Sequence, residues 1–330
     1  MRRYFPVLLL LSSSIAQESR DQLGRHWDYD ASTPLNVRQS GVQERQGIAI
    51  LDITYRSPLG DRAAGVGTNG GNVTAYLVLP SGKGPFPAVI FGHWCMPGSD
   101  KNNRTEFLDE AVVLAQAGVL SLLPNHVTAQ SGFPEDETLL NDQQIAVEVQ
   151  QVINLRRGAD LLVARKDVDP KRLAYVGHSC DGTSGAYLSG IDQRFKAFVI
   201  MAGQISYEVD RKMKWFQKHR QAIGPERFDA FWAKYAWMNP GMYVSHAAPA
   251  SVFLQYAAQD EATLNAMEYL KVVSAPKRLK IYQAPHSLNA AATRDRIAFL
   301  ARELYFKQPA HKAVNAIPVL FQPPWPDSGQ

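Results

Sequence analysis

A serine, an aspartate and a histidine occupy three places in this sequence where their side chains could carry out nucleophilic chemistry. Ser179 lies in the stretch RLAYVGHSCDGTSGAYLSG, in which a short apolar run ends at Gly177 and a segment of small residues follows. This pattern predicts a buried strand that turns into a helix within two or three residues, which leaves one side chain exposed on a strained turn. A serine there becomes a nucleophile when a histidine accepts its proton and a carboxylate orients that histidine.

The turn around Ser179 matches the G-x-S-x-G nucleophile elbow only in part. Gly177 occupies the first glycine position, where a side chain would obstruct the crossing of strand and helix, but Asp181 occupies the second. A register shifted by one residue would make Cys180 the nucleophile and would put His178 at the first glycine position. We favour Ser179 because the apolar run ends at Gly177. The alternative is a Gly-His-Ser sequence in an ordinary surface turn.

The acid and the histidine are expected in loops after later strands, in the order serine, acid, histidine. Asp260 follows the predicted strand SVFLQY, and His286 follows the predicted strand KRLKIY. Glu261 is an alternative acid, although it would lie one residue deeper in the next helix. His178 neighbours the serine but is expected to point elsewhere on the turn. Four other histidines do not follow a late strand: His126, His219, His246 and His311.

Acyl transfer also requires two backbone N–H groups that stabilise an oxyanion. One is expected from Cys180, and the other from the loop His93-Trp94-Cys95 after the predicted strand PAVIFG, with Cys95 as first choice and Trp94 as second. If Cys95 and Cys180 both donate, their backbones lie near each other, and in an oxidising compartment they could form a disulfide. Two free thiols lining the pocket are the alternative. His93 is expected either to brace the loop or to lie at the surface.

The remaining chain alternates between apolar strands and amphipathic helices. Strands are predicted at residues 48–55, 73–79, 87–92, 119–123, 173–176, 197–201, 251–256 and 279–282, and helices at 105–117, 138–164, 262–273 and 290–304. This alternation predicts an α/β fold with a mostly parallel sheet covered by helices on both faces. The main domain is expected at 46–306, preceded by an irregular N-terminal arm at 17–45 and followed by a Pro-rich, extended tail at 307–330.

A helical insertion interrupts this alternation at about 205–245 and is rich in aromatic residues. If it forms a lid, its inner wall favours an apolar or aromatic part of the substrate, with Trp215, Trp232 and the earlier Trp94 as candidate contacts. The aromatic spacing is also typical of an amphipathic helix that buries one face, so packing is the default interpretation. That spacing is seen at Phe228, Phe231, Trp232 and Tyr235.

The N-terminus has the pattern of an export signal. Residues 1–16, MRRYFPVLLLLSSSIA, combine two arginines, a short apolar run and small residues before a cleavage site, which predicts a periplasmic or secreted protein. The apolar run is too short to span a membrane, and no later stretch reaches eighteen apolar residues. Without Arg2 and Arg3 the chain holds 33 basic and 31 acidic residues, which gives no support to nucleic-acid binding.

No cofactor or metal is predicted. The sequence has no H-E-x-x-H motif, no clustered cysteine–histidine spacing and no P-loop. The segment Gly65 to Gly70 formally matches G-x-G-x-x-G, but it leads into a strand rather than a helix, so a dinucleotide site is not expected.

Four segments occur in the order PAVIFGHW, YVGHSCDG, QYAAQDE and QAPHSL. With them, residues 73–306 resemble α/β-hydrolases of the dienelactone-hydrolase and secreted-esterase branch. The resemblance implies that Ser179, Asp260 and His286 form a catalytic triad and that the chain has a small lid. It also implies that the protein hydrolyses carboxylic esters without a metal. Asp181 at the elbow and GHW in place of the usual His-Gly step depart from the family pattern, and the dienelactone members use cysteine, which keeps Cys180 open.

We therefore expect a serine hydrolase that acts on a small-molecule ester. An amidase, a peptidase or a lactone hydrolase with the same triad is an alternative, because triad chemistry does not set the leaving group. A non-catalytic binding protein on a hydrolase fold is a further alternative, which Asp181 leaves open.

Overall fold

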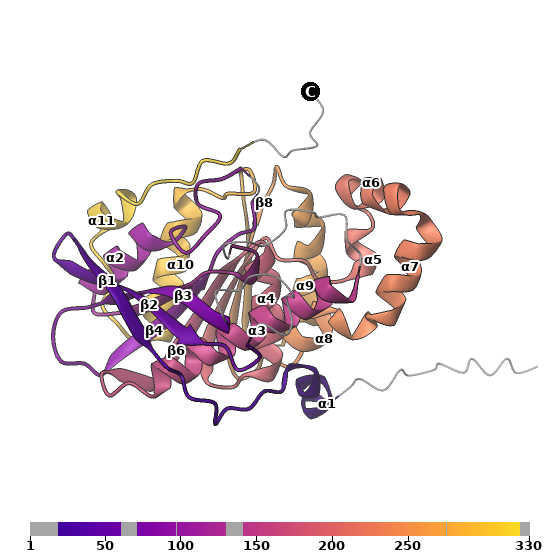
Figure 1. Cartoon of the computed structure of the whole chain (residues 1–330). Coiled ribbons are helices and arrows are strands. Elements are labelled where there is room, and N and C mark those ends of the chain that lie inside the picture. The colour runs from indigo at the N-terminus through magenta and orange to yellow at the C-terminus, as the bar shows by residue number, and fades with distance from the viewer. Residues whose placement is uncertain (1–18, 61–70, 97, 130–140, 275, 324–330) are drawn as a thin grey trace, which may run out of the picture.

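A nine-stranded mixed sheet forms the centre of the molecule (Figure 1). The computed structural model describes residues 19–60, 71–96, 98–129, 141–274 and 276–323, so the expected export signal and the Gly65 to Gly70 segment lie outside the described residues. The strand order is β1-β2-β3-β5-β4-β6-β7-β8-β9. The strands are β1 Arg38–Arg45, β2 Ile48–Arg56, β3 Asn72–Leu79, β4 Phe86–Gly92, β5 Leu120–Pro124, β6 Val168–His178, β7 Phe195–Met201, β8 Ser251–Ala257 and β9 Lys277–Tyr282.

Strands β5 to β9, with β4 between β5 and β6, run parallel, whereas β1, β2 and β3 are antiparallel to their neighbours. Parallel neighbours bring their carboxyl ends to one edge of the sheet, and this edge is where polar loops after apolar strands gather. The register His178↔Met201 shows that β6 and β7 end level with each other.

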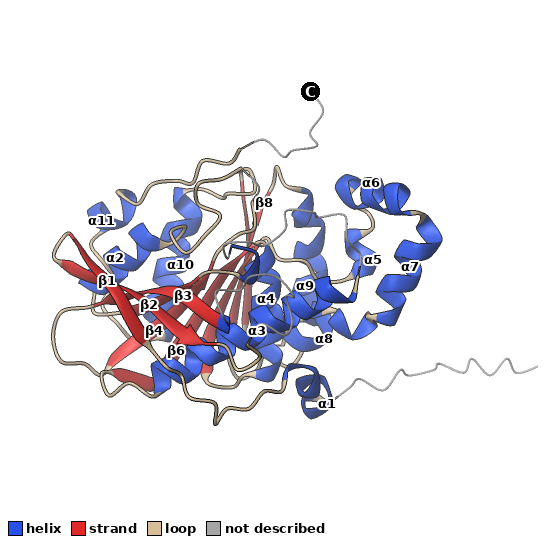
Figure 2. Ribbon diagram, in the orientation of Figure 1, coloured by secondary structure: helices blue, strands red, loops and turns tan. Residues whose placement is uncertain are grey.

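Helices cover both faces of the sheet, as the alternating pattern predicted (Figure 2). One face carries α2 Leu108–Gln116 and α10 Ala290–Glu303, with the short α11 His311–Asn315 beside them; the other carries α3 Asp142–Val163, α4 Cys180–Ile191, α8 Pro240–Val244 and α9 Ala266–Val272. Successive strand residues point to opposite faces. Val89 thus packs in the core with α2 and α10, while Ile90 packs in the core with α3 and α4.

The prediction of an irregular arm at 17–45 is partly wrong, because Arg38–Arg45 forms the edge strand β1. Nearly every side chain of β1 is exposed, so the strand shows no alternation of apolar and polar residues for sequence reasoning to detect. Gln46 and Gly47 form the turn into β2 with positive φ angles of 53° and 77°. Upstream, Trp27 is fully buried against Tyr187, so this part of the segment does lie on the domain.

Two other elements differ from the expected ones. The tail expected to be extended contains α11, and the helix expected at 262–273 is divided into a 3-10 turn, Glu261–Asn265, and α9. None of the helices in the described ranges is both long and apolar enough to cross a membrane.

The insertion at 205–245 is helical, as predicted. It comprises α5 Tyr207–Asp210, α6 Lys214–Ile223, α7 Pro225–Lys234, the turn Ala236–Met238 and α8. In Figure 1, α6 and α7 lie at the right-hand end, beyond α9. Met213, Phe216 and Phe228 form a small core of their own, with Trp232 packed against it. The aromatic spacing therefore serves packing between α6 and α7.

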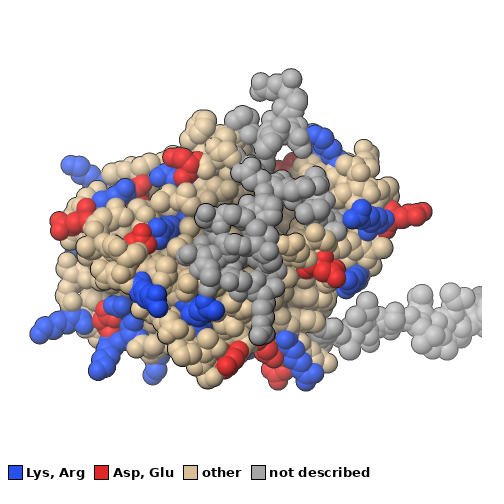
Figure 3. Space-filling model, in the orientation of Figure 1, with Lys and Arg blue, Asp and Glu red and all other residues tan. Residues whose placement is uncertain are grey.

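Charged residues of both signs are interspersed on the face shown in Figure 3. Several form ion pairs at the surface, such as Arg45 with Asp109 at 2.6 Å.

Candidate active site

The predicted strand-turn-helix at Ser179 is confirmed. β6 ends at His178 and α4 begins at Cys180, so the whole reversal falls on Ser179, which has φ 56° and ψ −113°. Non-glycine residues rarely adopt a positive φ, and one held there by its surroundings marks a functional turn. Two backbone hydrogen bonds hold it: Ser179 N donates to the carbonyl oxygen of Met201 at 2.8 Å, and its own carbonyl accepts from Thr183 N at 3.0 Å.

Two glycines permit the close crossing at this turn. A Cβ atom at Gly177 would lie 2.0 Å from the carbonyl oxygen of Asp181, and a Cβ at Gly182 would lie 2.5 Å from the carbonyl oxygen of Met201. Gly182 therefore lets α4 approach β7, one residue later than the elbow motif places its second glycine.

Asp181 fits the elbow because its side chain turns inward rather than into the crossing. The carboxylate is fully buried and accepts two hydrogen bonds from Nε2 of Gln151, at 2.9 and 3.2 Å. Burial raises the pKa of Asp181 to about 8. The carboxyl group is thus mostly protonated at neutral pH, which removes the cost of burying a full charge.

Asp260 and His286 are brought together at the same edge of the sheet. Asp260 follows β8 and His286 follows β9, and Nδ1 of His286 donates to Oδ2 of Asp260 at 2.6 Å. Oδ1 of Asp260 accepts from Ala262 N at 3.1 Å, which makes the aspartate the cap of the following turn. Burial raises the pKa of Asp260, but the hydrogen bond and charge of His286 outweigh it, so that the pKa is lowered overall.

The alternative acid, Glu261, is directed elsewhere. Its Oε2 accepts from the backbone N–H of Lys214 at 2.7 Å, at the start of α6. Glu261 therefore connects the insertion to the loop after β8, while Asp260 orients the histidine.

The loop that carries His286 contacts the elbow. Nε2 of His178 donates to the carbonyl oxygen of His286 at 3.0 Å, and the two imidazole rings stack with centroids 5.0 Å apart. Since His178 directly precedes Ser179, the half-buried serine and the histidine lie on adjoining loops.

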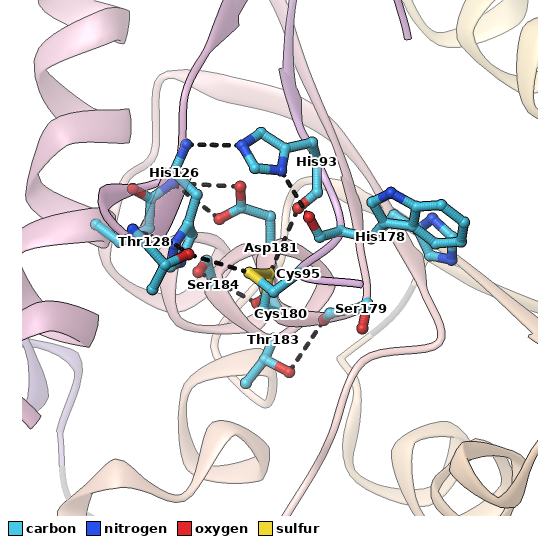
Figure 4. The surroundings of a disulfide bond; sticks show 12 residues. His93, Cys95, His126, Thr128, His178, Ser179, Cys180, Asp181, Thr183 and Ser184 are labelled. Atoms are coloured by element: carbon cyan, nitrogen blue, oxygen red, sulfur yellow. Dashed lines mark hydrogen bonds between the residues drawn. A yellow bond between two sulfur atoms is a disulfide. The ribbon is translucent and has the colours of Figure 1, made fainter. Parts of the chain in front are cut away.

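A disulfide joins the loop after β4 to the elbow (Figure 4). Cys95 and Cys180 are bonded, with their Cα atoms 5.8 Å apart, so the hypothesis of a bridge is confirmed over that of free thiols. Cys180 is consequently not available as a thiolate nucleophile in this state. The bridge brings close the backbones of the two residues favoured as oxyanion donors.

Two expectations for Trp94 are wrong. Its backbone N–H donates to Oε2 of Glu106 at 2.5 Å, so it is already engaged and leaves Cys95 as the candidate donor of this loop. Its side chain is fully buried and stacks on His178 at 5.2 Å, which prevents contact with a substrate. Nothing in the local sequence shows that Glu106, twelve residues later, would accept this hydrogen bond.

His93 braces the same loop, which confirms one of its two expected roles. It is buried, its Nδ1 donates to the carbonyl oxygen of Trp94 at 2.6 Å, and its Nε2 accepts from the backbone N–H of His126 at 2.8 Å. This arrangement requires the neutral ring, and burial lowers the pKa of His93 accordingly.

The other candidate contacts, Trp215 and Trp232, lie on α6 and α7. Trp215 packs edge-on against Phe216 at 5.1 Å, and Trp232 lies 6.2 Å from the same ring. A role for either in substrate binding stays a prediction.

Within the described ranges, one group of side chains has donor atoms close enough together for a metal ion. Cys95, His126 and Cys180 place one donor atom each within 4.8 Å of the others. Cysteine binds metals as a thiolate. Because the two sulfur atoms are bonded to each other, this group does not form a metal centre while the disulfide is intact.

A cavity of about 580 Å³ lies beside the loop that carries His286. It is lined by the neighbours of His286 and by the tail segment 319–323. Gln322 anchors this tail, because its Oε1 accepts from the backbone N–H of Ser287 at 3.1 Å.

Comparison with known proteins agrees with this architecture. No family model matches the chain. A Bacillus subtilis protein described as a hydrolase, YtaP, is 26% identical over 160 residues, which cover 44% of this chain and about half, 53%, of that relative.

Solved structures match over most of the chain. Acetyl xylan esterase 1 from Thermoanaerobacterium superposes with a TM-score of 0.66 at 16% identity, covering 87% of this chain and 94% of its own. A glucuronoyl esterase from Solibacter usitatus superposes with a TM-score of 0.59 at 14% identity, covering 86% and 91%. With the mostly parallel sheet, the flanking helices and the elbow at Ser179, these matches show that the chain has the α/β-hydrolase fold.

Proposed function

We propose that the protein is a serine hydrolase that cleaves carboxylic esters, with Ser179 as nucleophile, His286 as general base and Asp260 as orienting acid. The observation that carries the proposal is the hydrogen bond of 2.6 Å between His286 and Asp260, on a loop that contacts the elbow of Ser179. Because Nδ1 of His286 donates to Asp260, the neutral ring keeps its lone pair on Nε2, the atom that accepts the serine proton in a triad.

The proposed reaction has two steps. The Ser179 oxygen attacks the ester carbonyl while His286 takes the serine proton, and the same proton then passes to the departing alcohol as the ester bond breaks. Water next attacks the acyl-enzyme with His286 again as base, which releases the carboxylic acid and restores Ser179. The ionised state of Asp260, favoured by its lowered pKa, stabilises the imidazolium that forms in each step.

The N–H groups of Cys180 and Cys95 are the proposed oxyanion donors. Cys180 N lies at the N-terminus of α4, where backbone N–H groups are unpaired within the helix and favour negative charge. The disulfide supports the second donor, because it limits how far the loop after β4 can move from Cys180. Such donors act best when they are held in place before the charge forms.

Esters are preferred as the substrate class over amides and lactones because the neighbours in fold include an acetyl xylan esterase and a glucuronoyl esterase. Export to an oxidising compartment is supported by the disulfide, since such bonds persist outside the cytosol.

A fluorophosphonate probe tests the nucleophile. The protein is expected to become labelled, and Ser179→Ala to lose labelling, while Glu261→Gln, which keeps a polar side chain near the site, labels as the parent does. Equal labelling of Ser179→Ala and the parent would refute the assignment. No labelling of the folded parent would favour a binding protein, and faster cleavage of p-nitroanilides than of the matching p-nitrophenyl esters would favour an amidase.

A further inference from the structure

A second acid–histidine pair lies beside the proposed catalytic pair. Nδ1 of His178 lies 2.7 Å from Oε1 of Glu106, and the side chains of both residues are fully buried. The other ring nitrogen, Nε2, donates to the carbonyl oxygen of His286. Both nitrogens of His178 therefore face oxygen atoms, so one proton is held on Nε2 and another between Nδ1 and Glu106.

The Glu106 carboxylate also holds the loop after β4. Its second oxygen, Oε2, accepts from the backbone N–H of Trp94 at 2.5 Å, one residue before Cys95. Glu106 thus joins that loop to the elbow, and His178 joins the elbow to the loop of His286. Three segments that are far apart in the sequence meet at one buried pair.

Ring stacking strengthens the same connection. The Trp94 ring lies 5.2 Å from the His178 ring, and the His178 ring lies 5.0 Å from that of His286. The planes of Trp94 and His286 differ by only 6°. The imidazole of His178 therefore fills the space between Trp94 and His286, while its two nitrogens bond to Glu106 and to the carbonyl oxygen of His286.

A buried ion pair is weak support for stability, because the cost of removing two charged groups from water offsets much of their attraction. The value of this pair lies in what its hydrogen bonds orient. We propose that Glu106 and His178 are positioning residues of the hydrolase reaction, which hold the backbone of His286 and the oxyanion loop in register with Ser179. The inference rests on the proposed function and assigns neither residue a contact with substrate. A misplacement of about 1 Å in such a site can cost about 10²-fold in rate.

The test compares a conservative variant with a disruptive one. Glu106→Gln preserves the shape, since its amide oxygen can accept from Trp94 and its NH₂ group can donate to Nδ1 of a neutral His178. Glu106→Gln/His178→Phe keeps a ring in the stack but removes the hydrogen bond to His286, and it leaves no buried charge unpaired. We expect kcat of the double variant to fall about 10- to 100-fold with KM changed by less than about threefold, and kcat of Glu106→Gln to stay within about tenfold of the parent.

The matched control is Glu110→Gln. Glu110 forms a buried ion pair with Arg296 that is comparable in burial but connects α2 to α10. The substitution Glu110→Gln is expected to lower the stability of the protein without lowering kcat. If the folded double variant keeps the parental kcat, or if Glu110→Gln lowers kcat as much, the positioning role is wrong.

Proton NMR of the parent provides a measurement that does not depend on the double variant folding. Two far-downfield resonances are expected, one from Nδ1–H of His286 against Asp260 and one from Nδ1–H of His178 against Glu106. Glu106→Gln should remove one and leave the other. Retention of both would overturn the pairing. Failure of the proposed function is distinct: Ser179→Ala would then label like the parent, whatever these variants do.

Discussion

Removal of the disulfide is the most direct test of how the two loops proposed to supply the oxyanion donors are held. The change is Cys95→Ala/Cys180→Ala, which leaves no free thiol in the chain. The bridge spans a sequence separation of 85 residues, for which the chain-entropy relation gives a loss of about 4.6 kcal/mol in the free energy of unfolding. Because relaxation of the native state and residual structure in the unfolded state reduce the effect, a measured loss of about 2–5 kcal/mol is expected.

The assay is urea unfolding, followed by fluorescence, of the parent and the double variant with and without a dithiol reductant. The reduced parent should unfold at the same urea concentration as the double variant, and reductant should have no effect on that variant. The rate of ester cleavage should also fall, by up to about 10²-fold, because the N–H of Cys95 is no longer held near that of Cys180.

Two results would refute this reasoning. Alkylation followed by mass measurement could find two free thiols in the native protein, which would mean that the bridge does not form. Alternatively, the double variant could be as stable and as active as the parent, which would mean that the loop is held without the bridge, by the hydrogen bond that Glu106 accepts from Trp94 and the one that His93 donates to Trp94.

Three further predictions concern the elbow and the acid. Asp181→Asn should be more stable than the parent by on the order of 1–3 kcal/mol at pH 8, and its stability should be closer to that of the parent at pH 5. The reason is that the pKa of Asp181 in the folded state, about 8, exceeds the ordinary value of 3.8, so the parent loses stability as the pH rises from 3.8 to about 8. Urea unfolding of both proteins at both pH values checks this, and an equal difference in stability between them at pH 5 and pH 8 would contradict it. Asp260→Asn should lower kcat by about 10⁴-fold, the typical loss when a triad carboxylate becomes an amide, while Glu261→Gln stays near the parent; the reverse order in ester kinetics would make Glu261 the acid. Ser179→Gly should be about 1 kcal/mol more stable than Ser179→Ala in thermal unfolding, because glycine tolerates the positive φ, and equal stability would show that the turn is unstrained.

Much of the site could be predicted because its positions follow from local patterns. An apolar run ending at Gly177 and followed by small residues is enough to predict the reversal at Ser179, since few other residues permit so close a crossing. Asp260 and His286 could be predicted because each follows an apolar strand, and parallel strands end at one edge of the sheet.

Other features carried no local signal. β1 was missed because its exposed side chains show no alternation. Trp94 was the second candidate for the oxyanion donor and was expected to contact substrate, yet its burial and its bond to Glu106 arise from packing between two loops, which its sequence neighbours do not reveal.

The amino-acid sequence alone determined the order of most strands and helices, the turn at Ser179 and the residues available for the proposed triad, because strand burial, backbone sterics and turn chemistry depend on neighbours along the chain. Only the tertiary structure decided that Cys95 bonds to Cys180, that Asp181 is buried against Gln151, and that Glu106 and His178 join three loops. The physical reason is that these contacts span up to 108 residues of sequence, so they exist only once the sheet has brought the ends of its strands to one edge.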